Sequence, residues 1–302
     1  MALFEELAAV GDIAPGLQRH GMVDAYRDQR EFEKGIGDAH LLQRYGLENR
    51  ILNGNDIRDL FPALKTNIVG GIFYFKDAHL VPERLVRGLA RHAGQNGVDI
   101  QTHTEVIGMR KAGRRIAAVQ TTRVDVAAEE IVLAAGAWSP QIVGDLGLKL
   151  FVQPAKGYSI SYRRPADFPD MPLILVEAKV AVTPMDDILR FAGTLELAGW
   201  DLSINRRRVS AILKSIPAYL PDIDVRALEL VEIWRGMRPC TPDGLPYIGR
   251  PKAFDNLIVA TGHAMKGISL APVTGKVVSQ LAAGQPPAVD LSVLGVERFG
   301  RS

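Results

Sequence analysis

The chain has 302 residues, which is enough for two domains or for one domain with a large insertion. Hydrophobic residues make up 47% of it and charged residues 23%, and the net charge of +2 comes from scattered basic residues, which excludes a nucleic-acid partner. The densest basic run, Arg206-Arg207-Arg208, is interpreted as a solvated helix start, because phosphate binding needs a wider basic face.

The cysteine content and the length of the apolar runs indicate in which cellular compartment the protein is expected. Cys240 is the only cysteine, which excludes an intrachain disulfide and a cysteine-built metal site, and no H-E-x-x-H pair suggests another metal. The longest apolar runs fall short of the ~20 residues of a membrane span, and Glu5 and Glu6 stand where a signal peptide is basic. We therefore expect a cytoplasmic protein with no transmembrane segment, with a peripheral position at the inner membrane left open.

The first 77 residues mix helices with short strands. The pattern predicts an amphipathic helix over 1–19 that stops near Gly16, a strand over 22–27, a charged helix over 28–45, a brief helix over 55–60 and a strand over 68–75. Asn55 or Asp56 is the expected cap of the brief helix.

Residues 78–150 have a different pattern. A helix over 83–95 is expected behind Pro82, followed by a strand over 98–101, an antiparallel ribbon over 105–127 and a fully apolar strand over 131–135.

The second half repeats this change of pattern. Residues 151–235 are mostly alternating strands with one helix over 206–215, and the chain then returns to a strand over 257–261 and a long helix over 269–283. The sequence thus predicts an α/β (α+β) fold whose two domains are interleaved: 1–77 with 151–235, and 78–150 with 236–302.

Two apolar strands run directly into glycine, at Gly136 and at Gly262, and a helix follows each. Open α/β sheets bind nucleotides across the carboxyl ends of such strands, where glycine lets the backbone approach the ligand. One such strand end is more typical of a tight turn, whereas the pair in one chain keeps a nucleotide site open. The helix after Gly267 would direct its N–H groups at the second loop, which suits the negative edge of a reduced flavin.

Three side chains near these glycines have alternative interpretations. His263 and Lys266 could both add positive charge at the loop. Alternatively, His263 is a hydrogen-bonded loop histidine and Lys266 a solvated surface lysine. Arg238, set between Gly236 and Pro239, could bind a carboxylate in bidentate fashion or form an ion pair with Glu232 or Asp243. Nothing near Cys240 would activate it, so it is interpreted as an inert thiol and not as a nucleophile or a flavin attachment point.

These residues carry a family resemblance. The segments GMRPCTPDGLPYIGR (236–250) and NLIVATGHAMKGISLAPVTGKVVSQLAAG (256–284) match a C-terminal signature closely, IVLAAGAWSP (131–140) matches a flavin-side strand, and GGIFYFKDAHLVPER (70–84) and Lys156-Gly157-Tyr158 match weaker blocks. With them the chain resembles the FAD-dependent D-amino-acid oxidase superfamily, most of all its D-amino-acid dehydrogenases (small-subunit type) and glycine oxidases.

The resemblance implies roles for particular residues. Arg238 falls on the arginine that binds the substrate α-carboxylate. The FAD contacts fall on Val106 at the adenine side, on Ala135, Gly136 and Trp138 at the first strand end, and on Gly262, His263, Ala264, Met265, Lys266, Gly267, Ile268 and Ser269 at the isoalloxazine. The implied reaction is hydride transfer from the Cα of a small amino acid or amine to flavin N5, with oxygen or a quinone as the final electron acceptor.

The chain departs from the family pattern in two ways. Lys266 and Ala181 stand where glycine oxidases carry arginine and tyrosine, which favours a dehydrogenase-like or other small-amine pocket. The only near match to G-x-G-x-x-G, at 35–40, has His40 in place of the third glycine and follows a charged helix, so it is rejected. We therefore expect an N-terminally truncated, flavin-poor chain. The alternative is a non-catalytic fragment, or a subunit that needs another chain to complete its FAD site.

Overall fold

The computed structural model describes residues 1–64 and 67–300. The helices are α1 Ala2–Ala9, α2 Gln29–Arg44, α3 Gly54–Leu60, α4 Pro82–Gln95, α5 Ser139–Val143, α6 Arg206–Ser215 and α7 Gly267–Ala282, and a 3-10 turn η1 covers Gly136–Trp138. The strands are β1 Met22–Tyr26, β2 Asn49–Asn53, β3 Gly70–Tyr74, β4 Val106–Ala112, β5 Arg115–Thr121, β6 Ile131–Leu133, β7 Gln153–Arg163, β8 Leu173–Leu175, β9 Val180–Met185, β10 Ile188–Glu196, β11 Leu230–Cys240, β12 Tyr247–Gly249 and β13 Leu257–Thr261.

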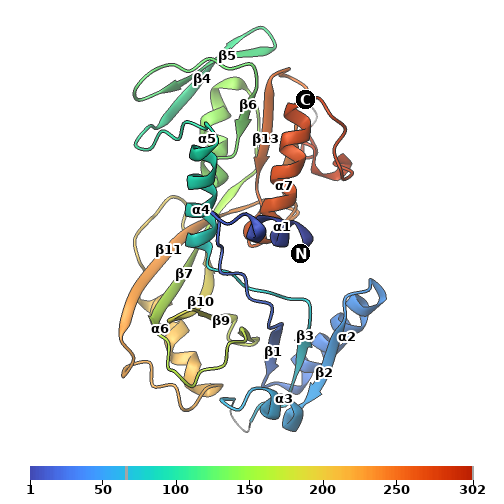
Figure 1. The fold of residues 1–302 in the computed structure, drawn as a ribbon, viewed down its shortest axis with the longest axis vertical. Helices are drawn as coiled ribbons and strands as arrows, with labels where there is room; N and C mark the ends of the chain where they lie inside the picture. The colour runs from blue at the N-terminus through green and yellow to red at the C-terminus, as the bar shows by residue number, and fades with distance from the viewer. Residues whose placement is uncertain (65–66, 301–302) are drawn as a thin grey trace.

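The described strands form three sheets. The largest has eight strands in the order β11-β7-β10-β9-β8-β1-β3-β2, and lies in the lower half of Figure 1. The upper half holds the three-stranded sheet β12-β13-β6, flanked by α5 and α7, and the ribbon β4-β5. This is the mixed α/β fold that the sequence predicts. The division into two domains stays a prediction, and β11 runs through its boundary at 235/236.

The main core lies against one face of the large sheet. Tyr158 and Ile160 of β7 and Phe191 of β10 are buried with Val209 and Ile212 of α6. Side chains alternate along a strand, so Gly157 and Ser159 of β7 face the other side. Arg238 lies on that other side, over Gly157.

Several predicted elements need correction. The expected helix over 1–19 is wrong beyond α1, because the backbone turns away and Gly16 takes a φ of +64°. The expected strand over 98–101 is irregular, with Val98 53% and Ile100 49% exposed. The cap of α3 is Asn53, whose side chain accepts from the N–H groups of Asn55 and Asp56 in a capping box.

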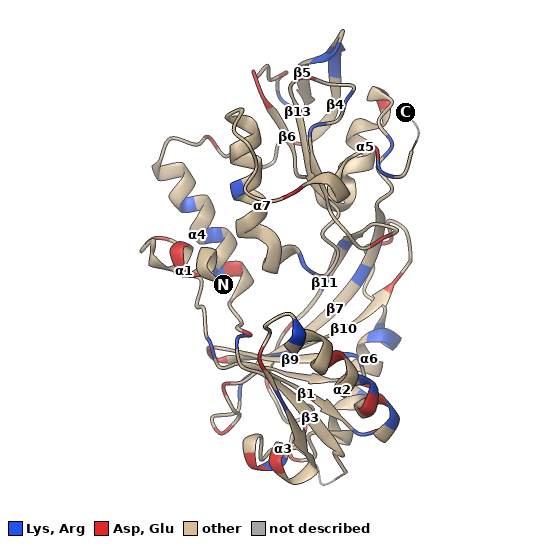
Figure 2. Cartoon of the chain, turned by 90° about the vertical axis from the view of Figure 1, so that its right-hand side faces the viewer, with Lys and Arg blue, Asp and Glu red and all other residues tan. Residues whose placement is uncertain are grey.

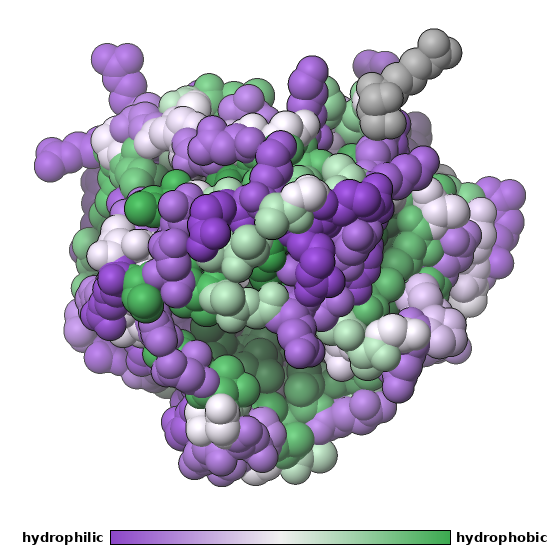
Figure 3. All heavy atoms as spheres, turned by 90° about the horizontal axis from the view of Figure 1, so that it is seen from above, coloured by the Kyte–Doolittle hydropathy of each residue, from purple (hydrophilic) through white to green (hydrophobic). Residues whose placement is uncertain are grey.

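Charged residues of both signs are scattered along the chain (Figure 2). The basic run at residues 206–208 opens α6, where Asn205 accepts from the N–H groups of Arg207 and Arg208, so its interpretation as a helix start is confirmed. Seen from above, hydrophilic and hydrophobic residues alternate over the face (Figure 3). No helix within residues 1–64 and 67–300 has the length and hydropathy needed to cross a bilayer.

Candidate functional site

Arg238 lies on the edge strand of the large sheet. In β11 it pairs with Ala155 of β7, and Gly236 pairs with Gly157 two residues along. The guanidinium lies over Gly157, where any Cβ would overlap it. Its Nη1 donates to the carbonyl oxygen of Thr194 at 3.0 Å, and burial lowers its pKa. The side chain is thus held in place while part of the fork stays available.

A cavity of about 520 Å³ adjoins the guanidinium. Its lining is mostly apolar, and includes Trp138, Ala192, Leu202, Trp234 and Met237 beside Arg238 and Arg235. No carboxylate is among the lining residues. An anion with an apolar body suits such a cavity better than a cation does.

The two carboxylates that were candidate partners of Arg238 pair elsewhere. Asp243 lies 2.8 Å from Arg298, and Glu232 lies 3.9 Å from Arg190. In the part of the chain that the structure describes, no ion pair joins Arg238 to a carboxylate. The ion-pair interpretation of Arg238 is therefore wrong.

The two glycine-ended strands lie side by side in the upper sheet. β13 runs parallel to β6. The Thr261 hydroxyl at the end of β13 donates to the Gly136 carbonyl at 2.9 Å. Gly136 has a φ of +55° and Gly262 a φ of +83°, values that glycine adopts without strain. The strand ends that the sequence singled out therefore form one continuous rim.

The loop 262–269 reaches from this rim toward Arg238. The Ala264 N–H donates to the Pro239 carbonyl at 3.0 Å, next to the arginine in sequence. His263 Nε2 lies 3.0 Å from the Thr274 hydroxyl, and burial lowers its pKa, so it is a hydrogen-bonded loop histidine. Met265, Lys266 and Ile268 are exposed, and α7 begins at Gly267, with Ser269 in its first turn.

The remaining predicted residues are placed at different distances from Arg238. Ala135 precedes η1, and Trp138 ends it, with its ring 5.6 Å from that of Trp200. Val106 begins β4, which Figure 1 shows at the far end of the upper half from β11. The structure thus brings Arg238, Trp138 and the two glycine loops together and leaves Val106 apart. Cys240 is half-buried, and its pKa is raised, first by burial, as expected of an inert thiol.

Several residues at the cavity carried no sequence signal of function. Thr194 sits at a bulge of β10 with a φ of +67°, an uncommon value for a β-branched residue. Leu202 and Trp200 come from the irregular connection 197–205, and Trp234 from β11. Thr194, Trp200 and Leu202 reach Arg238 only because segments far apart in sequence come together, so no local pattern could have identified them, whereas Trp234 shares β11 with Arg238.

Comparison with known proteins gives the family. Residues 1–281 match the family model described as FAD dependent oxidoreductase (DAO). The chain belongs to the DAO family. A D-amino acid dehydrogenase of Paramagnetospirillum magneticum is 33% identical over 305 residues, which cover 99% of this chain and 71% of that protein.

Two glycine oxidases extend the comparison with this DAO-family chain. The glycine oxidase of Pseudomonas aeruginosa is 33% identical over 232 residues, covering 76% of this chain and 62% of that protein. The crystal structure of glycine oxidase from Geobacillus kaustophilus superposes with a TM-score of 0.92 at 27% identity, covering 99% of this chain and 80% of the other. The chain is shorter than these relatives.

The residues of the rim fit the isoalloxazine half of FAD. No neighbouring atom lies within 4 Å of the Cβ position of Gly136, so a ligand can approach the backbone there. The start of α7 presents unpaired N–H groups and the positive end of the helix dipole beside this opening. Among described residues, no group of three or more His, Cys, Asp or Glu side chains could hold a metal ion.

Proposed function

We propose that this chain oxidises a small amino acid or amine with FAD as cofactor. The observation that carries the proposal is the hydrogen bond from Ala264 N–H to Pro239 O, because it joins the flavin-type loop to the strand of Arg238. In this proposal Arg238 holds the substrate carboxylate, and residues 135–138 and 262–269 hold the flavin. Val106 would contact the adenine side.

The side chains position the substrate more than they react with it. Arg238 orients the carboxylate, and the partial burial of its guanidinium beside apolar side chains strengthens that ion pair. Residues 135–138 and 262–269 would hold FAD, which would supply the two-electron oxidant for loss of hydride from the substrate Cα, and hydrolysis of the resulting imino acid would give a 2-oxo acid and ammonia or an amine. Oxygen or a quinone would be the final electron acceptor. No side chain lining the cavity has to act as a strong base.

Two features support a dehydrogenase-like pocket over a glycine oxidase pocket. Lys266 and Ala181 differ from the glycine oxidase pattern, and the similarity to a D-amino acid dehydrogenase covers 99% of this chain. We place such a protein in the cytoplasm or peripherally at the inner membrane, where a quinone is within reach. Faster turnover with an added quinone than with oxygen as the electron acceptor would support the dehydrogenase-like assignment.

The first experiment is an absorption spectrum of the purified chain with and without added FAD, followed by turnover of amino acids with a redox dye. A protein-bound flavin spectrum that amino acid bleaches supports the proposal. A chain that stays colourless with FAD present supports the alternative, a non-catalytic polypeptide or a subunit whose FAD site another chain completes.

The role of Arg238 is tested by Arg238→Met and Arg238→Lys. Loss of a bidentate, charge-assisted contact costs about 3 kcal/mol or more, so the methionine variant should raise the KM for amino acids about 100-fold. The lysine variant should retain part of the affinity. Unchanged KM values in both variants, with flavin still bound, would refute the carboxylate role.

A further inference from the structure

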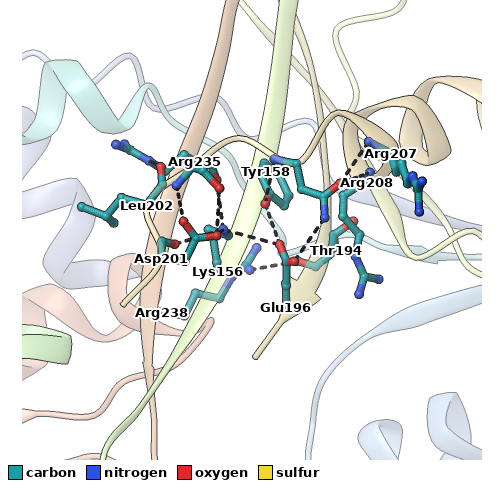
Figure 4. Close-up of polar contacts among 12 residues, drawn as sticks. Lys156, Tyr158, Thr194, Glu196, Asp201, Leu202, Arg207, Arg208, Arg235 and Arg238 are labelled. Carbon is teal, nitrogen blue, oxygen red and sulfur yellow. Dashed lines mark hydrogen bonds and ion pairs between the residues drawn. The ribbon is translucent and has the colours of Figure 1, made fainter. Parts of the chain in front are cut away.

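The connection 197–205 between β10 and α6 is tethered by a buried cation. The side chain of Lys156 in β7 is 0% exposed. Its Nζ donates to the carbonyl oxygens of Asp201 and Ser203 at 3.0 and 2.9 Å, and to Asp201 Oδ2 at 3.0 Å (Figure 4). Two of these three acceptors are backbone oxygens, so the ammonium fixes the course of the connection itself.

Both ends of the connection are held by the same network. Glu196 Oε2, 3.7 Å from Lys156 Nζ, accepts from the Tyr158 hydroxyl at 2.6 Å. Asn205, the cap of α6, donates its N–H to the same hydroxyl and its side-chain amide to Glu196. Burial alone lowers the pKa of Lys156, but the hydrogen bonds to Asp201 and Tyr158 and the charge of Glu196 outweigh it, so the pKa is raised. The cation therefore persists at physiological pH.

The tethered connection forms part of the Arg238 cavity. Leu202 lines the cavity, and its carbonyl accepts from Arg235 Nε at 2.5 Å. Trp200 packs against Trp138 of η1, which also lines the cavity. Leu202 is 45% and Trp200 41% exposed, so little packing from outside fixes these two side chains. Their position depends mainly on the tether.

We propose that Lys156 is a positioning residue that holds 197–205 as one wall of the Arg238 cavity, and that this wall sets the length of the apolar side chain which the cavity accepts. The inference rests on the proposed function, since the carboxylate end is taken to lie at Arg238. Lys156 itself touches no substrate.

The tryptophans provide a readout that needs neither flavin nor turnover. The chain has three tryptophans: Trp138 and Trp234 line the cavity, and Trp200 contacts Trp138. Intrinsic fluorescence therefore reports on this cavity. Titration with acetate, butyrate, hexanoate and octanoate should give affinities that rise about fourfold per buried methylene and stop rising where the wall is met.

Substitutions in the wall should change how affinity depends on the length of the carboxylate and should leave the affinity for acetate unchanged. We expect Leu202→Ala to move the limit to a longer carboxylate, and Lys156→Met to remove the limit, with acetate affinity in both within twofold of the wild type. Asp201→Asn, which keeps the backbone acceptors, should fall between Lys156→Met and the wild type. Lys111→Met, on an exposed position of β4, is the matched control and should change nothing.

Hydrogen exchange tests the tether without any ligand. Lys156→Met should speed amide exchange over 197–205 at least tenfold, while exchange in α2, on the far part of the sheet, stays as in the wild type. If Lys156→Met does not fold, Asp201→Asn and Leu202→Ala carry the same comparison.

The outcomes separate the two proposals. An unchanged length profile in the wall variants, or equal weakening for every carboxylate, overturns the role of the wall. Unchanged exchange over 197–205 overturns the role of Lys156. The proposed function is contradicted if Arg238→Met binds all carboxylates like the wild type, or if the wild type binds none of them. In either case hydrogen exchange still tests whether Lys156 holds the connection 197–205.

Discussion

The two halves of the candidate site are built in different ways. The flavin-type rim consists of two short segments, residues 135–138 and 262–269, each made of backbone groups and glycines, and the pairing of β6 with β13 brings them together. The Arg238 side consists of side chains from β7, β10, β11 and the connection 197–205, joined only through strand pairing. Both halves need distant strands to pair, but each segment of the rim is recognisable from its own local sequence, whereas most residues around Arg238 are not.

The largest expected effect comes from Gly157→Ala on the arginine side. A Cβ at this position would overlap the Arg238 guanidinium, so the side chain must leave its place over the strand. Carboxylate affinity should fall about 100-fold, as expected for loss of a charge-assisted pair. Fluorescence titration with butyrate measures it. Gly94→Ala in α4, where nothing lies within 4 Å of the new Cβ, is the control and should bind normally.

The flavin rim should instead respond through backbone strain. Gly262→Ala combines a φ of +83° with a Cβ position 2.7 Å from Thr241 Cγ2, and should cost about 3 kcal/mol of unfolding free energy. Gly136→Ala meets no neighbour and should cost about 1 kcal/mol. Urea denaturation measures both. Equal costs would show that the crowding by Thr241 is relieved elsewhere.

Two partly buried groups, Asp24 in the large sheet and His263 in the loop after β13, should make stability depend on pH in opposite senses. Burial, followed by the charge of Asp77, raises the pKa of Asp24 in β1 to about 6. An acid with a raised pKa stabilises the fold below its unfolded pKa, and that contribution is lost as the pH rises through about 6. Asp24→Asn should therefore be about 2–3 kcal/mol more stable than the wild type at pH 8 and similar to it at pH 4. Thermal melts across this pH range measure the difference between Asp24→Asn and the wild type, and Asp222→Asn, at an exposed position, is the control.

The smallest effect is expected at His263 on the flavin rim. Burial lowers its pKa, so its contribution to stability is present above the unfolded histidine pKa and is lost as the pH falls below it. Stability of the wild type should decline from pH 7.5 to 5.5, and His263→Gln should decline less steeply. His79 also has a pKa lowered by burial, so some slope remains. His40→Gln, at an exposed position, is the control. The prediction is contradicted if the stability of His263→Gln declines with falling pH as steeply as that of His40→Gln.

The sequence predicted the rim better than the arginine side for a physical reason. The strand β13 and the helices α6 and α7 carry their own periodicity and turn glycines, and were found within about two residues. The cap at Asn53 was missed because Asn55 and Asp56 offer equally good local chemistry. The irregular course of 98–101 has no local cause, since its apolar residues fit a strand well.

The arginine itself was identifiable, but its surroundings were not. Gly236, Arg238 and Pro239 form a recognisable block. That Thr194 would orient the guanidinium, or that Lys156 would be buried beneath a connection 45 residues later in the chain, depends on the order β11-β7-β10 in the sheet. Strand order is a global property, and a single sequence does not specify it locally.

In the proposed site, the hydrogen bond between Ala264 and Pro239 should make the cofactor and the substrate thermodynamically coupled ligands. Anything that stiffens the loop should also stiffen the strand beside Arg238, so ordering caused by the first ligand need not be repeated for the second. Coupling of this kind is reciprocal: a carboxylate that tightens flavin binding must be tightened by flavin to the same degree. The Ala264 amide hydrogen is protected from exchange only while the loop and the strand stay joined. Its exchange rate should therefore report how often they separate, and either ligand should lower that rate.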